Sequence, residues 1–285
     1  MKLPWTLAFL VLLTTATFAR EKTVALVADA QGQVQLVQAG QKSQASLLSY
    51  LAPGTRLELG PKARASLAFV EGGLRVNLAG PCQVALEESG VKLLEGDPTA
   101  VTSTRPQTRQ GKALPRDVNI ARGGGVRRDP ELALTVGQAI LPGDAIHWQA
   151  ADTINGFQIF LWEGDRRLLR EEVERQTRQL ALAPDLLEPG HTYEVELAGY
   201  RMSGQEVVLK KSVKVLATET AQRVSGLEQG ATGVAGKTEL LAVCLDLGLD
   251  YKSLNLTEDL LKQRPDDANL TRLRNELRKS LGLSD

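Results

Sequence analysis

The sequence predicts a mainly β protein with a small α-helical part towards its C-terminus. Short apolar segments separated by Gly- and Pro-containing turns recur over residues 20–96 and 131–217, where apolar and polar side chains alternate. After Thr218 the spacing of apolar residues changes from two to about 3.6, which is the period of an α-helix. A chain of 285 residues with these changes of pattern predicts two or three domains.

Residues 1–19 have the pattern of a signal peptide. Lys2 gives a basic start, residues 3–18 are largely apolar, and Thr17-Phe18-Ala19 supplies the small residues of a cleavage site. Cleavage would leave a mature chain beginning at Arg20, with no transmembrane segment; the alternative is that the segment is retained as an anchor. We therefore expect a periplasmic or secreted protein.

The first β-rich segment, residues 20–96, has the pattern of short strands joined by tight turns. Leu57-Glu58-Leu59 shows the alternation, and Gly60-Pro61 follows it as a turn. Strands with one buried and one exposed face fit an antiparallel sandwich, a barrel or a short coil of strands. We predict an all-β module of one of these kinds.

Residues 51–78 carry a family resemblance. They contain LAPG at 51–54, GPKA at 60–63 and GGLRVNL at 72–78. A large residue before a Gly turn, a Gly-x-x-Ala segment and a Gly-containing turn before a strand together resemble the FecR domain, a bacterial envelope module. The resemblance covers residues 30–94 and implies a β-rich fold located in the cell envelope.

Residues 97–130 are rich in Pro and Gly and contain no aromatic residue, so we predict a linker with one docked strand near residues 118–120. The segment is basic, and a basic arm that contacts a polyanionic lipid or wall polymer is an alternative. Nucleic acid is not an expected partner, because no aromatic side chain is present for base stacking. The 34 basic and 34 acidic residues of the whole chain also cancel.

The second β-rich segment, residues 131–217, is richer in aromatic residues. Residues 187–197 place a Pro-Gly turn before a strand that opens with Tyr193, and Trp148 lies in an earlier alternating strand. This pattern resembles the fibronectin type III and immunoglobulin-like sandwich, which implies that Tyr193 and Trp148 are core residues.

One strand of this segment places aromatic side chains on its second face. Phe160 and Trp162 alternate with Ile159 and Leu161. Because successive side chains of a strand point to opposite faces, a core role for Ile159 and Leu161 predicts that Phe160 and Trp162 face solvent.

Residues 218–285 carry the helical pattern. Gly248 ends a first apolar helix, and a second helix begins near Asn255, which would cap it, and stops at Pro265. Gly248, Ser253 and Pro265 fall at the spacing of the Gly, the small residue and the Pro of a tetratricopeptide repeat. The segment resembles one such repeat, which implies a helical hairpin used for protein contact.

A third predicted helix follows Asp266-Asp267 and carries an apolar stripe. A single repeat is too small to be stable alone, since about three stacked units are normally needed. Either the sandwich or another chain must cover the stripe. We predict that it is a protein contact surface, made of Leu270, Leu273, Leu277 and Leu281.

No catalytic, metal or cofactor site is predicted. Residues 231–238 match a relaxed phosphate-binding loop, but a polar stretch precedes them where a strand is required, so we expect a Gly-rich joint that opens a helix. His147 and His191 have no further His or Cys at metal-ligand spacing. Cys82 and Cys244 lie in different predicted domains and are expected to be buried thiols, with a disulfide between them as the alternative.

These features predict an exported envelope adaptor that is not an enzyme. It would bind another envelope protein, or a second copy of itself, through the leucine stripe. One alternative is a module that binds cell-wall glycan or a surface polymer through Phe160 and Trp162. The other is an enzyme of unknown type, which the missing catalytic constellations disfavour.

Overall fold

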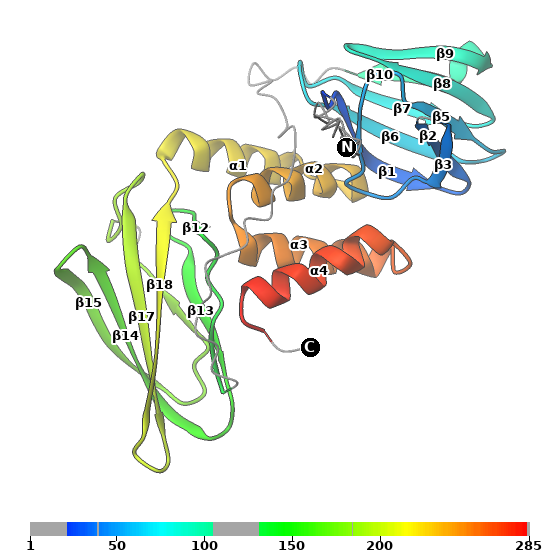
Figure 1. Ribbon diagram of the computed structural model, residues 1–285. Coiled ribbons are helices and arrows are strands. Elements are labelled where there is room, and N and C mark those ends of the chain that lie inside the picture. The colour runs from blue at the N-terminus through cyan, green and yellow to red at the C-terminus, as the bar shows by residue number, and fades with distance from the viewer. Residues whose placement is uncertain (1–21, 39, 105–130, 184, 284–285) are drawn as a thin grey trace, which may run out of the picture.

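The computed structural model describes residues 22–38, 40–104, 131–183 and 185–283. They form two β modules and four C-terminal helices (Figure 1). The mainly β fold class is thus confirmed. The predicted signal peptide and the predicted strand near residues 118–120 lie outside the described residues.

The first module is a sandwich of two five-stranded antiparallel sheets. Its strands are β1 (Ala25–Gln31), β2 (Val34–Gln38), β3 (Gln41–Gln44), β4 (Tyr50–Leu51), β5 (Arg56–Leu59), β6 (Arg64–Phe69), β7 (Arg75–Ala79), β8 (Cys82–Glu87), β9 (Gly90–Gly96) and β10 (Val101–Thr104). One sheet has the order β10-β7-β6-β1-β4, and the other has the order β3-β2-β5-β8-β9. Of the three predicted all-β architectures, the sandwich is therefore the one observed.

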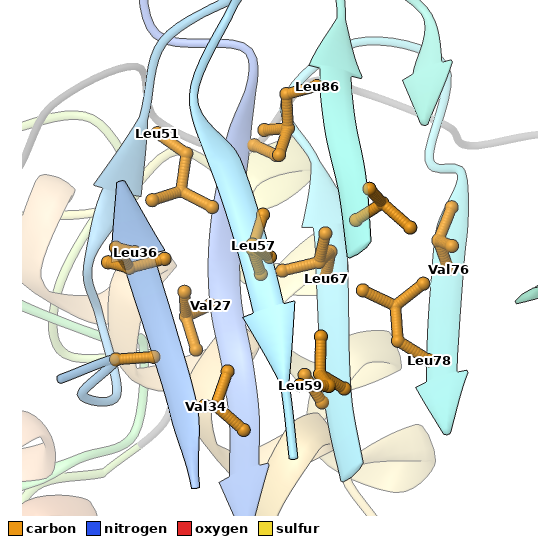
Figure 2. Close-up of a cluster of buried hydrophobic side chains, with 14 of the residues drawn as sticks. Val27, Val34, Leu36, Leu51, Leu57, Leu59, Leu67, Val76, Leu78 and Leu86 are labelled. Carbon is orange, nitrogen blue, oxygen red and sulfur yellow. The ribbon is translucent and has the colours of Figure 1, made fainter. Parts of the chain in front are cut away.

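The inward-facing side chains of both sheets meet in one hydrophobic core (Figure 2). Leu57 and Leu59 point inward from β5, while Arg56 is exposed and Glu58 is half-buried on the other face. This is the alternation that the sequence predicts for a strand with one face in the core.

Strands β1 and β6 depart from this alternation because both of their faces are buried. Ala25 and Val27 enter the core between the sheets, and Leu26 and Ala28, on the opposite face of β1, are also fully buried. Helix α2 (Gly233–Asp246) contacts β1 and covers this second face. A continuous apolar run is the sequence pattern of a strand covered on both sides.

The predicted linker boundary at residue 97 is wrong. Residues 98–100 form a short 3-10 helix, and β10 pairs with β7 through Val101 and Leu78. The Asp97 carboxylate caps this turn by accepting a hydrogen bond from the Thr99 backbone N–H at 2.8 Å. Residues 97–104 therefore belong to the first module, and residues 105–130 lie outside the described part of the chain.

The second module is a sandwich of a three-stranded and a five-stranded sheet. Its strands are β11 (Leu132–Leu134), β12 (Ala139–Ile140), β13 (Ala145–Ala150), β14 (Ile154–Glu163), β15 (Arg166–Glu174), β16 (Gln179–Ala181), β17 (Thr192–Arg201) and β18 (Glu206–Val215). The sheet orders are β11-β13-β16 and β12-β18-β17-β14-β15. All pairs are antiparallel except β12 with β18.

The predicted core residues of this sandwich are confirmed. Trp148 is 1% exposed and meets the Phe157 ring edge-on, and Tyr193 is 3% exposed. The Tyr193 hydroxyl accepts a hydrogen bond from the Glu188 backbone N–H at 2.8 Å, which ties the start of β17 to the turn before it. This contact has the form of the tyrosine corner of immunoglobulin-like sandwiches.

Four helices follow: α1 (Thr218–Gly230), α2 (Gly233–Asp246), α3 (Asp250–Gln263) and α4 (Ala268–Ser280). Gly248 has a positive φ of 71° in the turn after α2, as predicted for a residue that ends a helix. The expectation that Asn255 caps the second helix is wrong, because α3 starts at Asp250 and places Asn255 in the middle of the helix. No helix among the described residues is long and apolar enough to cross a membrane.

The helices lie between the two β modules and contact both (Figure 1). Towards the sandwich, the backbone N–H of Ala139 donates to the Gly248 carbonyl at 3.0 Å. Gly137 makes this approach possible, because a Cβ there would lie only 2.5 Å from the Gly248 oxygen. Towards the first module, Arg75 and Glu239 form an ion pair at 2.6 Å.

Candidate functional site

The leucine stripe of α4 is not a surface. Its exposed fractions are 0% for Leu270, 7% for Leu273, 0% for Leu277 and 1% for Leu281. The four side chains pack in a hydrophobic cluster with residues of α2 and α3 and with Leu47 of the first module. The predicted protein contact is therefore an internal packing face, covered by neighbouring helices and by a loop from the far end of the chain.

The face that carries Phe160 and Trp162 is the outer side of the five-stranded sheet of the sandwich. Phe157, Ile159 and Leu161 of β14 are buried in the core, while Phe160 and Trp162 are half-buried on the opposite side. The two rings stack with centroids 6.4 Å apart and planes 28° from parallel. The structure thus brings the two predicted aromatic residues together on one face.

Two arginines of β15 flank this aromatic pair. The Arg167 guanidinium lies 5.9 Å from the centroid of the Trp162 ring, and the Arg170 guanidinium lies at the same distance from the Phe160 ring. The strand register aligns Phe160 with Arg170 and Trp162 with Arg167 across the β14–β15 pair. The four side chains form a cation–π ladder that combines aromatic surface with hydrogen-bond donors.

Polar side chains continue the same face on both sides of the ladder. The Tyr200 hydroxyl donates to Gln158 Oε1 at 3.0 Å, and Gln158 Nε2 donates to Glu172 at 2.7 Å. Hydrogen bonds from Lys210 to Glu196 and Glu194 raise the pKa of the Lys210 ammonium. Positive and negative groups therefore alternate over this sheet, with the aromatic pair among them.

The relaxed phosphate-loop match does not form a loop. Gly233 to Thr238 are the first residues of α2, and Thr238 is fully buried with its hydroxyl donating to the Val234 carbonyl at 2.9 Å. Lys237 lies 3.3 Å from the Asp259 carboxylate of α3. Both side chains thus have partners within the helical part.

The histidines and cysteines are not part of the ladder, although His191 contacts Glu163, the residue after Trp162. His191 bonds Glu163 at 2.9 Å at one end of the sheet, whereas His147 stacks on Tyr251 at the boundary with α3. Cys82 and Cys244 are free and buried, as predicted, and burial raises the pKa of the Cys244 thiol to about 12. No group of three or more metal-ligating side chains occurs within the described ranges.

A hollow on the first module was missed by the sequence analysis. It lies on the solvent side of the sheet β3-β2-β5-β8-β9 and has a volume of about 380 Å³. Polar residues that alternate with core positions are the only signal for it in the sequence. The polar groove, as we call it, is lined mainly by Gln33, Gln35, Glu58, Pro81, Gln83 and Glu95.

No protein-family model and no curated protein matches the chain. Among solved structures, the chain is similar to a β-1,2-glucanase from Parabacteroides distasonis, with 11% identity over 85% of this chain and 48% of that chain, and a TM-score of 0.27. It is also similar to the spore cortex lytic enzyme SleM of Clostridium perfringens, with 14% identity over 42% of this chain and 36% of that chain, and a TM-score of 0.22.

A third similar structure contains the FN1-FN3 domains of chicken CNTN1, with 11% identity over 68% of this chain and 55% of that chain, and a TM-score of 0.22. The chain spans less than two thirds of the length of each of these three proteins. Similarities this low carry no functional argument.

Proposed function

We propose that the protein is a non-enzymatic binding protein of the cell envelope, and that the outer sheet of its sandwich contacts a surface polysaccharide. The single observation that carries the proposal is the stacked, half-buried Phe160–Trp162 pair on the outer side of the sheet, with an arginine over each ring. Sugar rings present C–H groups to aromatic faces and hydroxyl groups to flanking donors and acceptors. The ladder offers both kinds of contact within one strand pair.

The burial of the leucine stripe changes which function the geometry favours. The adaptor hypothesis required a surface for another protein, made of Leu270, Leu273, Leu277 and Leu281. These four side chains are buried in an internal hydrophobic cluster. Phe160 and Trp162, in contrast, are half-buried on the outer side of the sheet, with the guanidinium groups of Arg167 and Arg170 over their rings. Binding of a wall glycan or surface polymer is therefore the hypothesis that we favour.

The surrounding charges suit a ligand rich in hydroxyl groups. The guanidinium groups of Arg167 and Arg170 are hydrogen-bond donors towards a ligand, and the carboxylates of Glu172 and Glu196 are acceptors. A face of mixed charge has no strong net field to attract a polyanion or a polycation. Recognition would depend on local hydrogen bonds and ring contact.

The test is retention of the purified protein on insoluble peptidoglycan sacculi, chitin and cellulose. We expect retention on at least one of the three, and we expect the double change Phe160→Ala with Trp162→Ala to weaken it about tenfold or more, since burial of a ring is worth ~1 kcal/mol or more. Trp162→Phe should retain much of the binding, because the Trp162 indole nitrogen has no hydrogen-bond partner among the described residues.

Met202→Ala is the matched control. Met202 lies in the turn between β17 and β18 and is 76% exposed, so its loss should change neither folding nor retention. Equal retention of the double variant and the unchanged protein would contradict the proposal. Capture of an envelope protein that depends on the aromatic pair, without retention on any polysaccharide, would restore the adaptor function at a different surface.

A further inference from the structure

A row of polar side chains crosses four neighbouring strands of the first module. The strand registers align Gln35 of β2 with Glu58 of β5, Glu58 with Gln83 of β8, and Gln83 with Glu95 of β9. The chain neighbours of Gln35, Glu58 and Gln83 belong to the core between the sheets, so these three side chains lie on the solvent side, and Glu95 is exposed opposite Gln83. The register thus assembles an amide–carboxylate row from residues that are far apart in the sequence.

The row forms part of the polar groove described above. A volume of about 380 Å³ falls at the small end of ligand pockets, which hold about 300 to 1,000 Å³, and suits one or two sugar rings. Close backbone packing shapes the end of the groove at Gly96, which has a φ of 118°. A Cβ at this position would lie 2.8 Å from the Cys82 Cβ, so Gly is required there.

The amides of the groove are available to a ligand. Within the described ranges, the side chains of Gln33, Gln35 and Gln83 have no hydrogen-bond partner in the protein, in contrast to Gln44 of the same sheet, which donates to the Gly32 carbonyl. A Gln amide provides two donors and one acceptor. Three such amides in one hollow match the paired donor and acceptor character of vicinal hydroxyl groups.

The charges of the groove select among possible ligands. Lys42 lies 2.6 Å from the Glu58 carboxylate and neutralises it, while Glu95 has no ion pair among the described residues. An anionic ligand would be repelled by Glu95, and no Lys or Arg is among the described residues that line the groove. The exposed ring of Pro81 offers an apolar patch at the rim.

From this geometry we propose that the polar groove is a saccharide-binding site for one or two uncharged sugar rings, held by hydrogen bonds to Gln33, Gln35, Gln83 and Glu95. It lies on a different module from the Phe160–Trp162 ladder and stands independently of that face. With both sites present, the protein would hold a polysaccharide at two points.

The experiment uses the full-length protein labelled with nitrogen-15 and follows the side-chain amide signals of its glutamines. The probes are cellobiose, N,N′-diacetylchitobiose and maltose. We expect saturable shifts of the Gln35 and Gln83 amide signals with at least one of them. Each lost hydrogen bond weakens binding several-fold. The double variant Gln35→Ala, Gln83→Ala should therefore raise the sugar Kd, read from the remaining Gln33 amide signal, by about tenfold or more.

Gln44→Ala is the matched control and should leave the sugar titration unchanged, since its amide is already bonded within the protein. The proposal is overturned if none of the three sugars shifts the groove amides, or if the shifts persist unchanged in the double variant. A titration with calcium chloride that moves these signals, where the sugars do not, would replace the saccharide site by a cation site.

The two proposals fail separately. In the Phe160→Ala, Trp162→Ala variant the groove should still bind the soluble sugars with unchanged affinity. Loss of that binding would show that the groove is not an independent site. A different outcome is that the groove binds soluble sugars but the aromatic double variant is retained on insoluble polysaccharides as well as the unchanged protein is. That result would support the groove site and refute the function proposed for the ladder.

Discussion

The His147 imidazole stacks on the Tyr251 ring, with ring centroids 4.2 Å apart and planes 22° from parallel. His147 belongs to β13 and Tyr251 to α3, so this pair joins the second sandwich to the helical part. Burial lowers the pKa of His147, and the nearby Asp144 carboxylate opposes that shift. The contact therefore favours the neutral imidazole.

This relationship predicts a pH dependence of stability. The folded pKa of His147 lies below its unfolded value of about 6.5, so its contribution is complete above that pH and is lost as the pH falls towards the folded pKa. We expect Tm to fall more between about pH 7 and pH 5 in the unchanged protein than in His147→Phe, which keeps a ring without the charge.

The comparison of the two proteins is needed because buried carboxyl groups act in the opposite direction. Burial raises the pKa of Asp144 and Asp250, and such groups stabilise the fold as the pH falls. Calorimetric melts at several pH values give the difference directly. Identical pH slopes for the two proteins would show that the pKa of His147 is the same in the folded and unfolded states.

Asp267 is predicted to stabilise the fold through both of its carboxylate oxygens. One accepts from the Leu270 backbone N–H at 3.0 Å and caps α4, and the other accepts from the Leu47 N–H of the first module at 2.9 Å. Asp267→Ala should cost about 1 to 3 kcal/mol in unfolding free energy, because a cap and a docking bond are lost together. Denaturant titration measures this cost.

The neighbouring Asp266 is exposed and serves as the control. Asp266→Ala should stay within about 0.5 kcal/mol of the unchanged protein. If both alanine changes have the same small effect, Asp267 does not hold the helices to the first module.

Leu277 is predicted to be a stability residue and not a contact for another chain. It is fully buried in the cluster that α4 shares with Leu47, so Leu277→Ala should cost about 2 to 5 kcal/mol. Size-exclusion chromatography below the melting temperature should show no change in oligomeric state. A variant that keeps its Tm but dissociates from a partner would return α4 to the role of an interface.

Trp148 is predicted to be a core residue whose indole nitrogen contributes no hydrogen bond. The side chain is 1% exposed, and its Nε1 has no partner among the described residues. Trp148→Ala should cost about 3 to 5 kcal/mol, whereas Trp148→Phe keeps most of the ring contact with Phe157 and should cost clearly less. Chemical denaturation measures both costs. If the two variants lose the same unfolding free energy, the indole N–H makes a hydrogen bond that the described structure does not contain.

The strands and cores of both β modules could be predicted from the sequence, because alternation reports directly which side of a strand is buried. Trp148, Tyr193, Phe160 and Trp162 all lie on the faces that this alternation indicates. The partner of an apolar face could not be predicted in the same way. The stripe around Leu277 is visible in the sequence, but the loop that covers it belongs to a distant segment.

The polar groove could not be predicted for a related reason. Gln35, Glu58, Gln83 and Glu95 are ordinary polar positions of four separate strands, and only the strand register places them in one row. A sequence reports the face of each residue but not its neighbour across the sheet. The spacing of the turns gave no information on which strands would pair.

The helices lie between modules that precede them in the chain, and this has a consequence for how the protein is made. Leu26 and Ala28 form an apolar outer surface on β1 that is buried only when α2 is in place. Because the chain is synthesised from its N-terminus, this apolar surface would stay exposed while the whole second sandwich is made. Products that stop before α2 should therefore aggregate or be degraded, so that assembly of the first module depends on segments made last.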